Sequence, residues 1–215
     1  MGVSPVSNWP ISFMNRILQL VKSWVESFRR DLALFSVGEI ARRYFVMNAF
    51  DGALTILGIV VGFAVSGEEH PRFVLTSGAG ASLAMGISGA VGAYMAEIAE
   101  RRQELKELEN HMFQSLRGSR MARAIRVAAL WVALVDGISP ALAATIPIIP
   151  FWLVSKGVLT IQMGIMASIA LNLATLFTLG AFLGKVSGER IWLRGFLMVG
   201  AGIVTMLILL AASAL

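Results

Sequence analysis

Residues 44–65 read YFVMNAFDGALTILGIVVGFAV, an apolar stretch that contains a single charged residue, Asp51. At 1.5 Å per residue, a helix of this length measures roughly 30 Å, which matches the thickness of the hydrocarbon core of a bilayer. The stretch is therefore predicted to cross a membrane as a helix.

Similar apolar stretches follow, at about residues 73–96, 127–146, 161–183 and from 192 to the C-terminus. The 215-residue chain is 57% hydrophobic and only 14% charged, whereas a soluble domain carries about 25% charged residues. So much apolar surface requires lipid as its solvent. We predict an all-α, polytopic membrane protein with about five transmembrane helices. The third span is expected to stop or bend at Pro147 and Pro150, because proline donates no backbone hydrogen bond.

Residues 1–40 are predicted to form a separate cytoplasmic or interfacial segment, ahead of a transmembrane domain at 41–215. No small-residue cleavage site follows an apolar core in this segment, so no signal peptide is expected. Its apolar residues have helical spacing, which is typical of an amphipathic helix in the membrane interface or packed on the protein's own cytoplasmic face. These residues are Ile11, Met14, Ile17, Leu18, Val21, Trp24, Val25 and Phe28. A second helical extension is predicted at about 97–122.

Basic residues gather on alternate loops. They precede the first span, lie between the second and third spans, and lie between the fourth and fifth, whereas the two opposite loops offer only Arg72 and Lys156. Because Lys and Arg are retained on the cytoplasmic side, the N-terminus is expected in the cytoplasm and the C-terminus outside. The same distribution argues against a nucleic-acid partner for the net charge of +5.

Several chemistries lack their residues. The chain has no cysteine, which excludes disulfides, thiolate metal sites and cysteine nucleophiles. It also contains no HExxH, GxSxG or phosphate-binding GK[ST] sequence, and only His70 and His111 are available as histidine bases. We therefore expect a protein that is not an enzyme and holds no resident cofactor.

Asp51 is the most informative residue of the spans. It lies about 10 Å inside the first span, where a carboxylate costs at least about 2.5 kcal/mol. Such a group is expected to face protein or water, as a cation ligand or a proton carrier. The alternative is a structural carboxylate that is hydrogen-bonded to a neighbouring helix.

Two residues of other spans are further candidates for a transport pathway. Asp136 lies near the middle of the third span, where Gly137, Ser139 and Pro140 suggest a helical turn that opens and frees carbonyl ligands; the alternative is a buried residue that fixes packing. Met85, in the second span, offers a thioether suited to transition metals, although most methionines only pack.

Acidic residues step by three and four along the extension of the second span: Glu97, Glu100, Glu104, Glu107 and His111. They share one helical face, where like charges repel and a bound cation would relieve the repulsion. Carboxylates with an imidazole suit iron(II), manganese(II) or zinc(II). The alternative is a solvated helix face with compensating charges.

Four segments resemble the vacuolar iron transporter family. They are Asp51–Thr55 in the first span, Ile146–Phe151 at the end of the third, Leu176–Lys185 in the fourth and Gly195–Ala201 in the fifth. The similarity extends over about residues 40–213, and it lies in the order and spacing of these segments rather than in any one of them. The chain looks like a divergent, prokaryotic-type member of that family with a shortened cytoplasmic metal-binding insert.

The resemblance implies five spans, a homodimer, and exchange of cytoplasmic iron(II) or manganese(II) for protons along a pathway lined by the first two spans. It implies a prokaryotic plasma membrane as the location. It assigns the metal to Asp51 and to the glutamates of the extension. The second span departs from the family pattern Ser-Met-x-x-Gly-Glu-Tyr, because Gly89 stands in place of the methionine and Ala93 in place of the glutamate. The competing hypothesis is therefore a non-transporting membrane scaffold or assembly protein on the same fold.

Overall fold

The structure, a computed structural model, describes residues 19, 37–113, 115–116 and 119–213. Over these residues the chain forms five helices that are long and apolar enough to cross a membrane. They are α2 (Val37–Ser66), α3 (Arg72–Met112), α4 (Arg120–Ser155), α5 (Ile161–Ser187) and α6 (Ile191–Ser213). The prediction of an all-α polytopic membrane protein is thus confirmed. The predicted N-terminal amphipathic helix falls on residues that lie, almost entirely, outside the described part of the chain.

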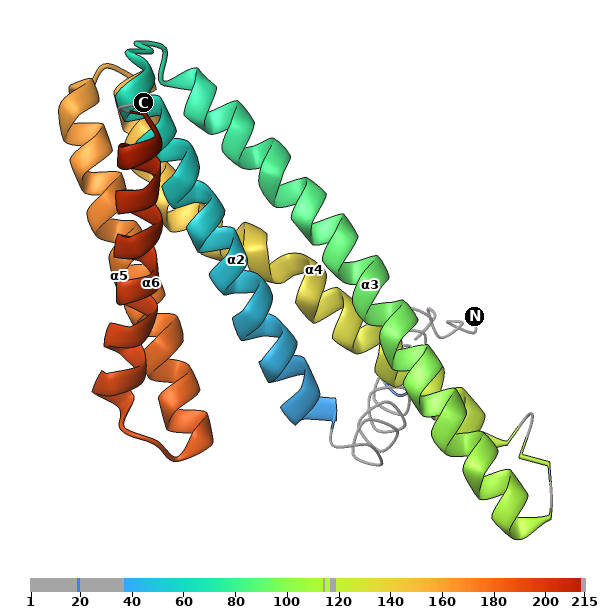
Figure 1. Ribbon diagram of the computed structural model, residues 1–215. Coiled ribbons are helices and arrows are strands. Elements are labelled where there is room, and N and C mark those ends of the chain that lie inside the picture. The colour runs from blue at the N-terminus through green and yellow to red at the C-terminus, as the bar shows by residue number, and fades with distance from the viewer. Residues whose placement is uncertain (1–18, 20–36, 114, 117–118, 214–215) are drawn as a thin grey trace, which may run out of the picture.

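Helix α2 is the centre of the bundle and contacts α3, α4, α5 and α6. Figure 1 shows α3 on one side of α2 and the α5–α6 hairpin on the other, with α4 crossing behind. The main core cluster joins Ile56, Val60 and Phe63 of α2 to Phe151 of α4, and the Phe63 and Phe151 rings meet edge to face at 5.3 Å. Outward-facing side chains are large and apolar, as for Ile87, which suits a lipid environment.

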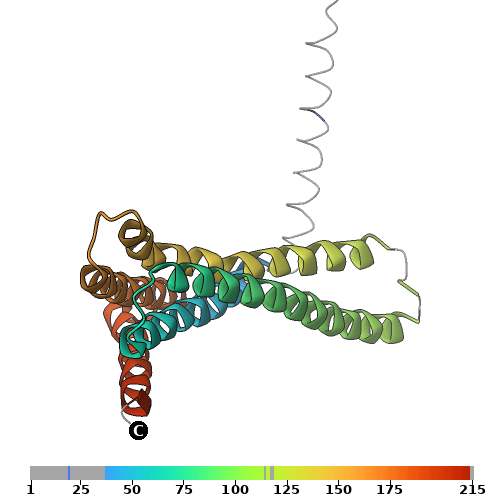
Figure 2. The same ribbon diagram turned by 90° about the horizontal axis from the view of Figure 1, so that it is seen from above.

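Helices α3 and α4 run side by side beyond the other helices (Figures 1 and 2). The extension predicted at about 97–122 corresponds to the last turns of α3 and the first residues of α4. A small apolar cluster of Ile98, Leu105, Ile125 and Ala129 holds the two helices together there. Ser119 begins α4, because its side chain accepts a hydrogen bond from the Ala122 N–H.

The sequence predicted that the third span would stop or bend at Pro147 and Pro150, but the helix does not stop at either residue. Helix α4 continues through Pro140, Pro147 and Pro150 to Ser155. Proline removes the N–H that would bond to the carbonyl four residues earlier, and side-chain donors can take its place in transmembrane helices. For Pro140 that carbonyl belongs to Asp136, and the Ser139 hydroxyl donates to it at 2.7 Å. The expected end near residue 146 is therefore wrong by about two helical turns.

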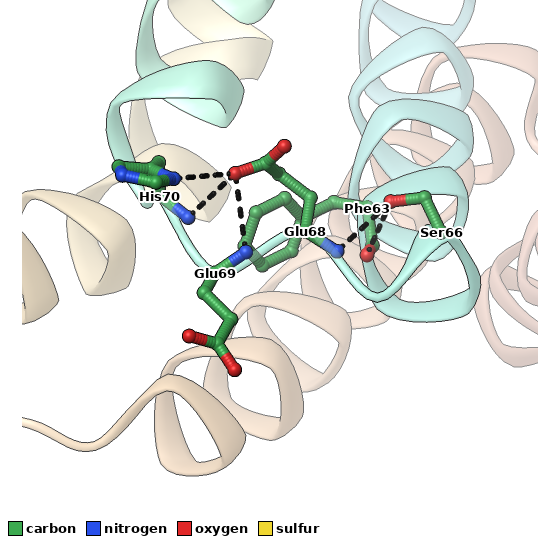
Figure 3. A network of polar contacts seen from close by, with 5 residues as sticks. All are labelled: Phe63, Ser66, Glu68, Glu69 and His70. Carbon is green, nitrogen blue, oxygen red and sulfur yellow. Dashed lines mark hydrogen bonds and ion pairs between the residues drawn. The ribbon is translucent and has the colours of Figure 1, made fainter.

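The turn between α2 and α3 is organised by one carboxylate (Figure 3). Glu68 Oε1 accepts hydrogen bonds from the backbone N–H groups of His70 (2.9 Å) and Glu69 (3.1 Å). It also lies 2.7 Å from the ring Nδ1 of His70. These bonds, led by the His70 backbone N–H, hold the pKa of Glu68 below its usual value. The turn is thus closed by its own side chains, at the end of the bundle opposite the C-terminal end of α3 (Figure 1).

Labelling of single cysteines tests whether successive loops lie on opposite sides of the membrane. Ser115 lies between α3 and α4, and Ser155 ends α4 at the opposite end of the bundle. Both are exposed, and the parent chain has no cysteine. Ser115→Cys and Ser155→Cys are expected to react with an impermeant maleimide from opposite sides of sealed vesicles. Reaction of both from one side would contradict the five-span arrangement.

Candidate functional site

Asp51 faces an open hollow between α2 and α3. The hollow measures about 430 Å³ and is lined by Asn48, Asp51, Ala84, Met85, Ser88 and Gly89. The Asp51 side chain is exposed in the single chain, and its carboxylate has no hydrogen bond or ion pair among the described residues. The Thr55 hydroxyl donates to Met85 Sδ at 3.4 Å and so fixes the thioether beside this hollow. The structure thus brings Asp51 and Met85, two predicted pathway residues, to one place.

Asp136 is buried in α4, with 5% of its surface exposed. Its carbonyl would bond to the N–H of residue 140 in a regular helix, but Pro140 has none. Two side-chain donors take that place, Ser139 Oγ at 2.7 Å and Asn48 Nδ2 at 3.0 Å. The helix stays continuous through these residues, so the expected open turn with free carbonyl ligands is wrong.

Asn48 connects the two aspartates. It lies one turn before Asp51 on α2, lines the same hollow, and donates to the Asp136 carbonyl. Gly89 of α3 makes the approach possible, because a Cβ there would lie 2.2 Å from Asn48 Nδ2 and 2.7 Å from Asp136 Oδ2. Our sequence reasoning missed Asn48. The available signal was a second polar residue in the first span, on the same helical face as Asp51.

Gly86 of α3 lies at a close contact with α4. A Cβ at Gly86 would lie 2.5 Å from the carbonyl oxygen of Gly137, which is backbone and cannot move aside alone. Gly92, two turns further on, has no such neighbour within 4 Å in the described chain. Small residues at such crossings let transmembrane helices approach closely.

We expect Gly86→Ala to destabilise the protein by about 1–3 kcal/mol, because the added methyl group forces α3 and α4 apart. Gly92→Ala is the matched control. It is expected to be neutral or slightly stabilising, since alanine is the better helix former. Thermal unfolding of both variants in detergent would measure this. Equal unfolding temperatures would show that the α3–α4 contact is looser than described.

The acidic face of α3 separates into two parts. Glu97 is only 2% exposed and its Oε2 accepts a hydrogen bond from Arg101 Nε at 3.1 Å. Glu100 and Glu104 are exposed, and they share a hollow of about 280 Å³ with Glu97, Arg101 and Arg43. Two guanidinium groups therefore accompany the three carboxylates in this hollow.

The remaining two predicted ligands lie further out on α3. Glu107 is exposed and accepts from Gln103 Nε2 at 3.4 Å. The His111 ring Nδ1 lies 2.7 Å from the carbonyl of Glu107, on its own helix. Within the described residues of one chain, no three His, Asp or Glu side chains gather closely enough to hold a metal ion. A metal site built from these residues would need other ligand types or a second copy.

Comparison with known proteins agrees with the fold and the resemblance. The model of the VIT family matches residues 42–117 and 107–213, which include all of α3–α6 and most of α2. The chain is also 32% identical over 169 residues to an uncharacterized protein of Methanocaldococcus jannaschii, covering 77% of this chain and 85% of that relative. The resemblance to the vacuolar iron transporters is confirmed: this integral membrane protein belongs to the VIT family, a family of metal-ion transporters.

Proposed function

We propose that this protein moves iron(II) or manganese(II) out of the cytoplasm in exchange for protons. The main support is the Asp51 carboxylate, which has no hydrogen-bond or ion-pair partner among the described residues and faces an open hollow beside the Met85 thioether. A charged group inside a span is costly, so a carboxylate that bonds to no described residue of a neighbouring helix favours a ligand role over a structural one. Carboxylate and thioether together favour a transition metal over calcium or magnesium.

The second copy in a homodimer would close the hollow. One wall of the hollow is formed by small residues of α3, Ala84 and Ser88, which are exposed in the single chain. Small exposed residues allow close approach of another helix. Two Asp51 carboxylates and two Met85 thioethers would then face a shared pathway. Asp136, joined to the hollow through Asn48, is the candidate for a second carboxylate on that pathway.

The experiment uses purified protein in sealed proteoliposomes that contain a pH-sensitive dye. Iron(II), manganese(II), zinc(II) and calcium(II) are each added outside, and metal uptake and internal pH are followed together. We expect iron(II) or manganese(II) uptake with proton movement in the opposite direction, and little response to calcium(II). An absence of uptake for every metal, with the protein folded, would favour a scaffold on the same fold.

Glu100 and Glu104 are proposed to gather cations at the cytoplasmic mouth. Since they would concentrate ions without carrying them across, Glu100→Gln combined with Glu104→Gln should raise the half-saturating metal concentration by about tenfold at low ionic strength, with the maximal rate largely unchanged. The difference should shrink as salt is added. Glu69→Gln removes an exposed carboxylate at the opposite end of the bundle and serves as the control for each single variant. An unchanged half-saturating concentration would make the pair a solvated helix face.

A further inference from the structure

A basic cleft lies between the extended ends of α3 and α4. It measures about 550 Å³, and Arg102, Lys106 and Arg126 contribute cations to it from both helices. All three side chains are exposed. Leu105 and Ile125, which also belong to the small apolar cluster of the extension, form part of its lining. The cleft therefore combines positive charge with an apolar floor.

The cations of the basic cleft have no counterion within the part of the chain that the structure describes. Among the described residues, Arg102, Lys106 and Arg126 form no ion pair. Arg102 and Lys106 are one helical turn apart, where like charges repel. The acidic side chain that lines the cleft, Glu109, is held by the loop, because its Oε1 accepts from the Leu116 N–H at 2.6 Å and from the Ser115 hydroxyl at 3.4 Å. An external anion would relieve the repulsion.

The depth of the basic cleft indicates the source of that anion. Arg126 immediately precedes the apolar stretch that begins at Val127, and Arg102 lies six residues beyond Ala96, the last residue of the second apolar stretch. Six residues of helix span about 9 Å, slightly more than the roughly 5–7 Å of headgroup layer on each side of a bilayer. Arg126 is thus level with the headgroup layer, and Arg102 lies at its outer edge.

We propose that the basic cleft binds the headgroup of an anionic phospholipid. Arg102 and Arg126 hold the phosphate, Lys106 faces the outer part of the headgroup, and the carbon atoms of the headgroup lie on Leu105 and Ile125. Basic pockets between transmembrane helices commonly hold anionic lipids in this way. A soluble phosphate would use the cations but not the apolar floor. The bound lipid would link the extended ends of α3 and α4, next to the glutamates of α3.

The test measures lipid binding to the full-length protein in a neutral detergent by native mass spectrometry. Phosphatidylglycerol is titrated against phosphatidylcholine, and we expect selective binding of phosphatidylglycerol. The triple variant Arg102→Gln, Lys106→Gln, Arg126→Gln should weaken that binding by about a hundredfold, at about fivefold per cation near the membrane surface. The matched control is Arg123→Gln, Lys185→Gln, Arg190→Gln, which removes three exposed cations outside the cleft and should bind as the parent does.

Two outcomes would overturn the proposal. One is equal phosphatidylglycerol binding by the triple variant and the parent, with both eluting as the same folded species. The other concerns the source of the anion: inorganic phosphate displaces the lipid from the parent, whereas chloride at the same ionic strength does not. That result would assign the cleft to a soluble phosphate ligand. Because the readout is binding, neither outcome depends on whether the protein transports metal.

Discussion

Asp51→Asn is expected to lower metal-driven proton movement by about a hundredfold, which corresponds to about 3 kcal/mol for the loss of one charged metal ligand. Asparagine has nearly the same shape as aspartate but can neither neutralise a metal cation nor release a proton. Because the Asp51 side chain is exposed and has no hydrogen-bond partner among the described residues, its replacement should leave the unfolding temperature unchanged. Proteoliposome transport and thermal unfolding are measured on the same preparation.

Glu39→Gln is the matched control for Asp51→Asn. Glu39 is an exposed carboxylate on the same helix, α2, but it does not line the hollow. Its substitution removes the same charge and should leave transport within about twofold of the parent, because exposed charges distant from the pathway are screened. A parent-like rate for Asp51→Asn would assign Asp51 to packing and remove the main support for the proposed mechanism.

Glu97→Gln is expected to destabilise the protein by about 3 kcal/mol, because it leaves the Arg101 guanidinium buried without its carboxylate. The two side chains of this ion pair are 2% and 7% exposed, and their charged atoms lie 3.1 Å apart. For a chain of this size, the unfolding temperature should fall by roughly 6–12 °C. Glu100→Gln, one turn further on and exposed, should shift stability by at most about 0.5 kcal/mol.

A double-mutant cycle shows whether the Glu97–Arg101 pair acts as a unit. Arg101→Gln alone should also destabilise the protein, and the double variant should lose less than the sum of the two single variants. The opposite pattern would return Glu97 to the set of metal ligands: Glu97→Gln as stable as the parent, but with fewer bound manganese(II) ions in titration calorimetry.

The sequence was sufficient to predict the transmembrane helices, but it was less successful in predicting the residues at which they end. The spans predicted at about 161–183 and from 192 onward correspond closely to α5 and α6, because an apolar stretch in lipid must satisfy its backbone hydrogen bonds within a helix. The end of α4 was misjudged, because the helix was expected to stop or bend at Pro147. Whether a proline ends a transmembrane helix depends on donors from other helices, such as Asn48 of α2, which bonds to the carbonyl that Pro140 leaves without its helical donor.

The sequence likewise predicted only part of the candidate site. Asp51 and Asp136 stand out in the sequence because carboxylates are rare in apolar spans, and Met85 could be placed on the second span. Asn48, which connects the two aspartates in space, was missed, since its importance depends on a partner 88 residues away. The glutamates of α3 looked equivalent along their helix, yet only packing against α2 and α4 distinguishes the buried Glu97 from the exposed Glu100 and Glu104.

By itself, the sequence determined that this is a polytopic helical membrane protein and that acidic residues lie within its spans. Both follow from the local free energy of transferring side chains and backbone into lipid, which depends on residue type and spacing alone. Only the tertiary structure decided which polar groups are paired and which are available. Which groups are paired depends largely on contacts between helices that are distant in the chain. The absence of a side chain at Gly89 allows Asn48 and Asp136 to approach each other. Arg101 donates a hydrogen bond to Glu97, whereas Asp51 faces an open hollow.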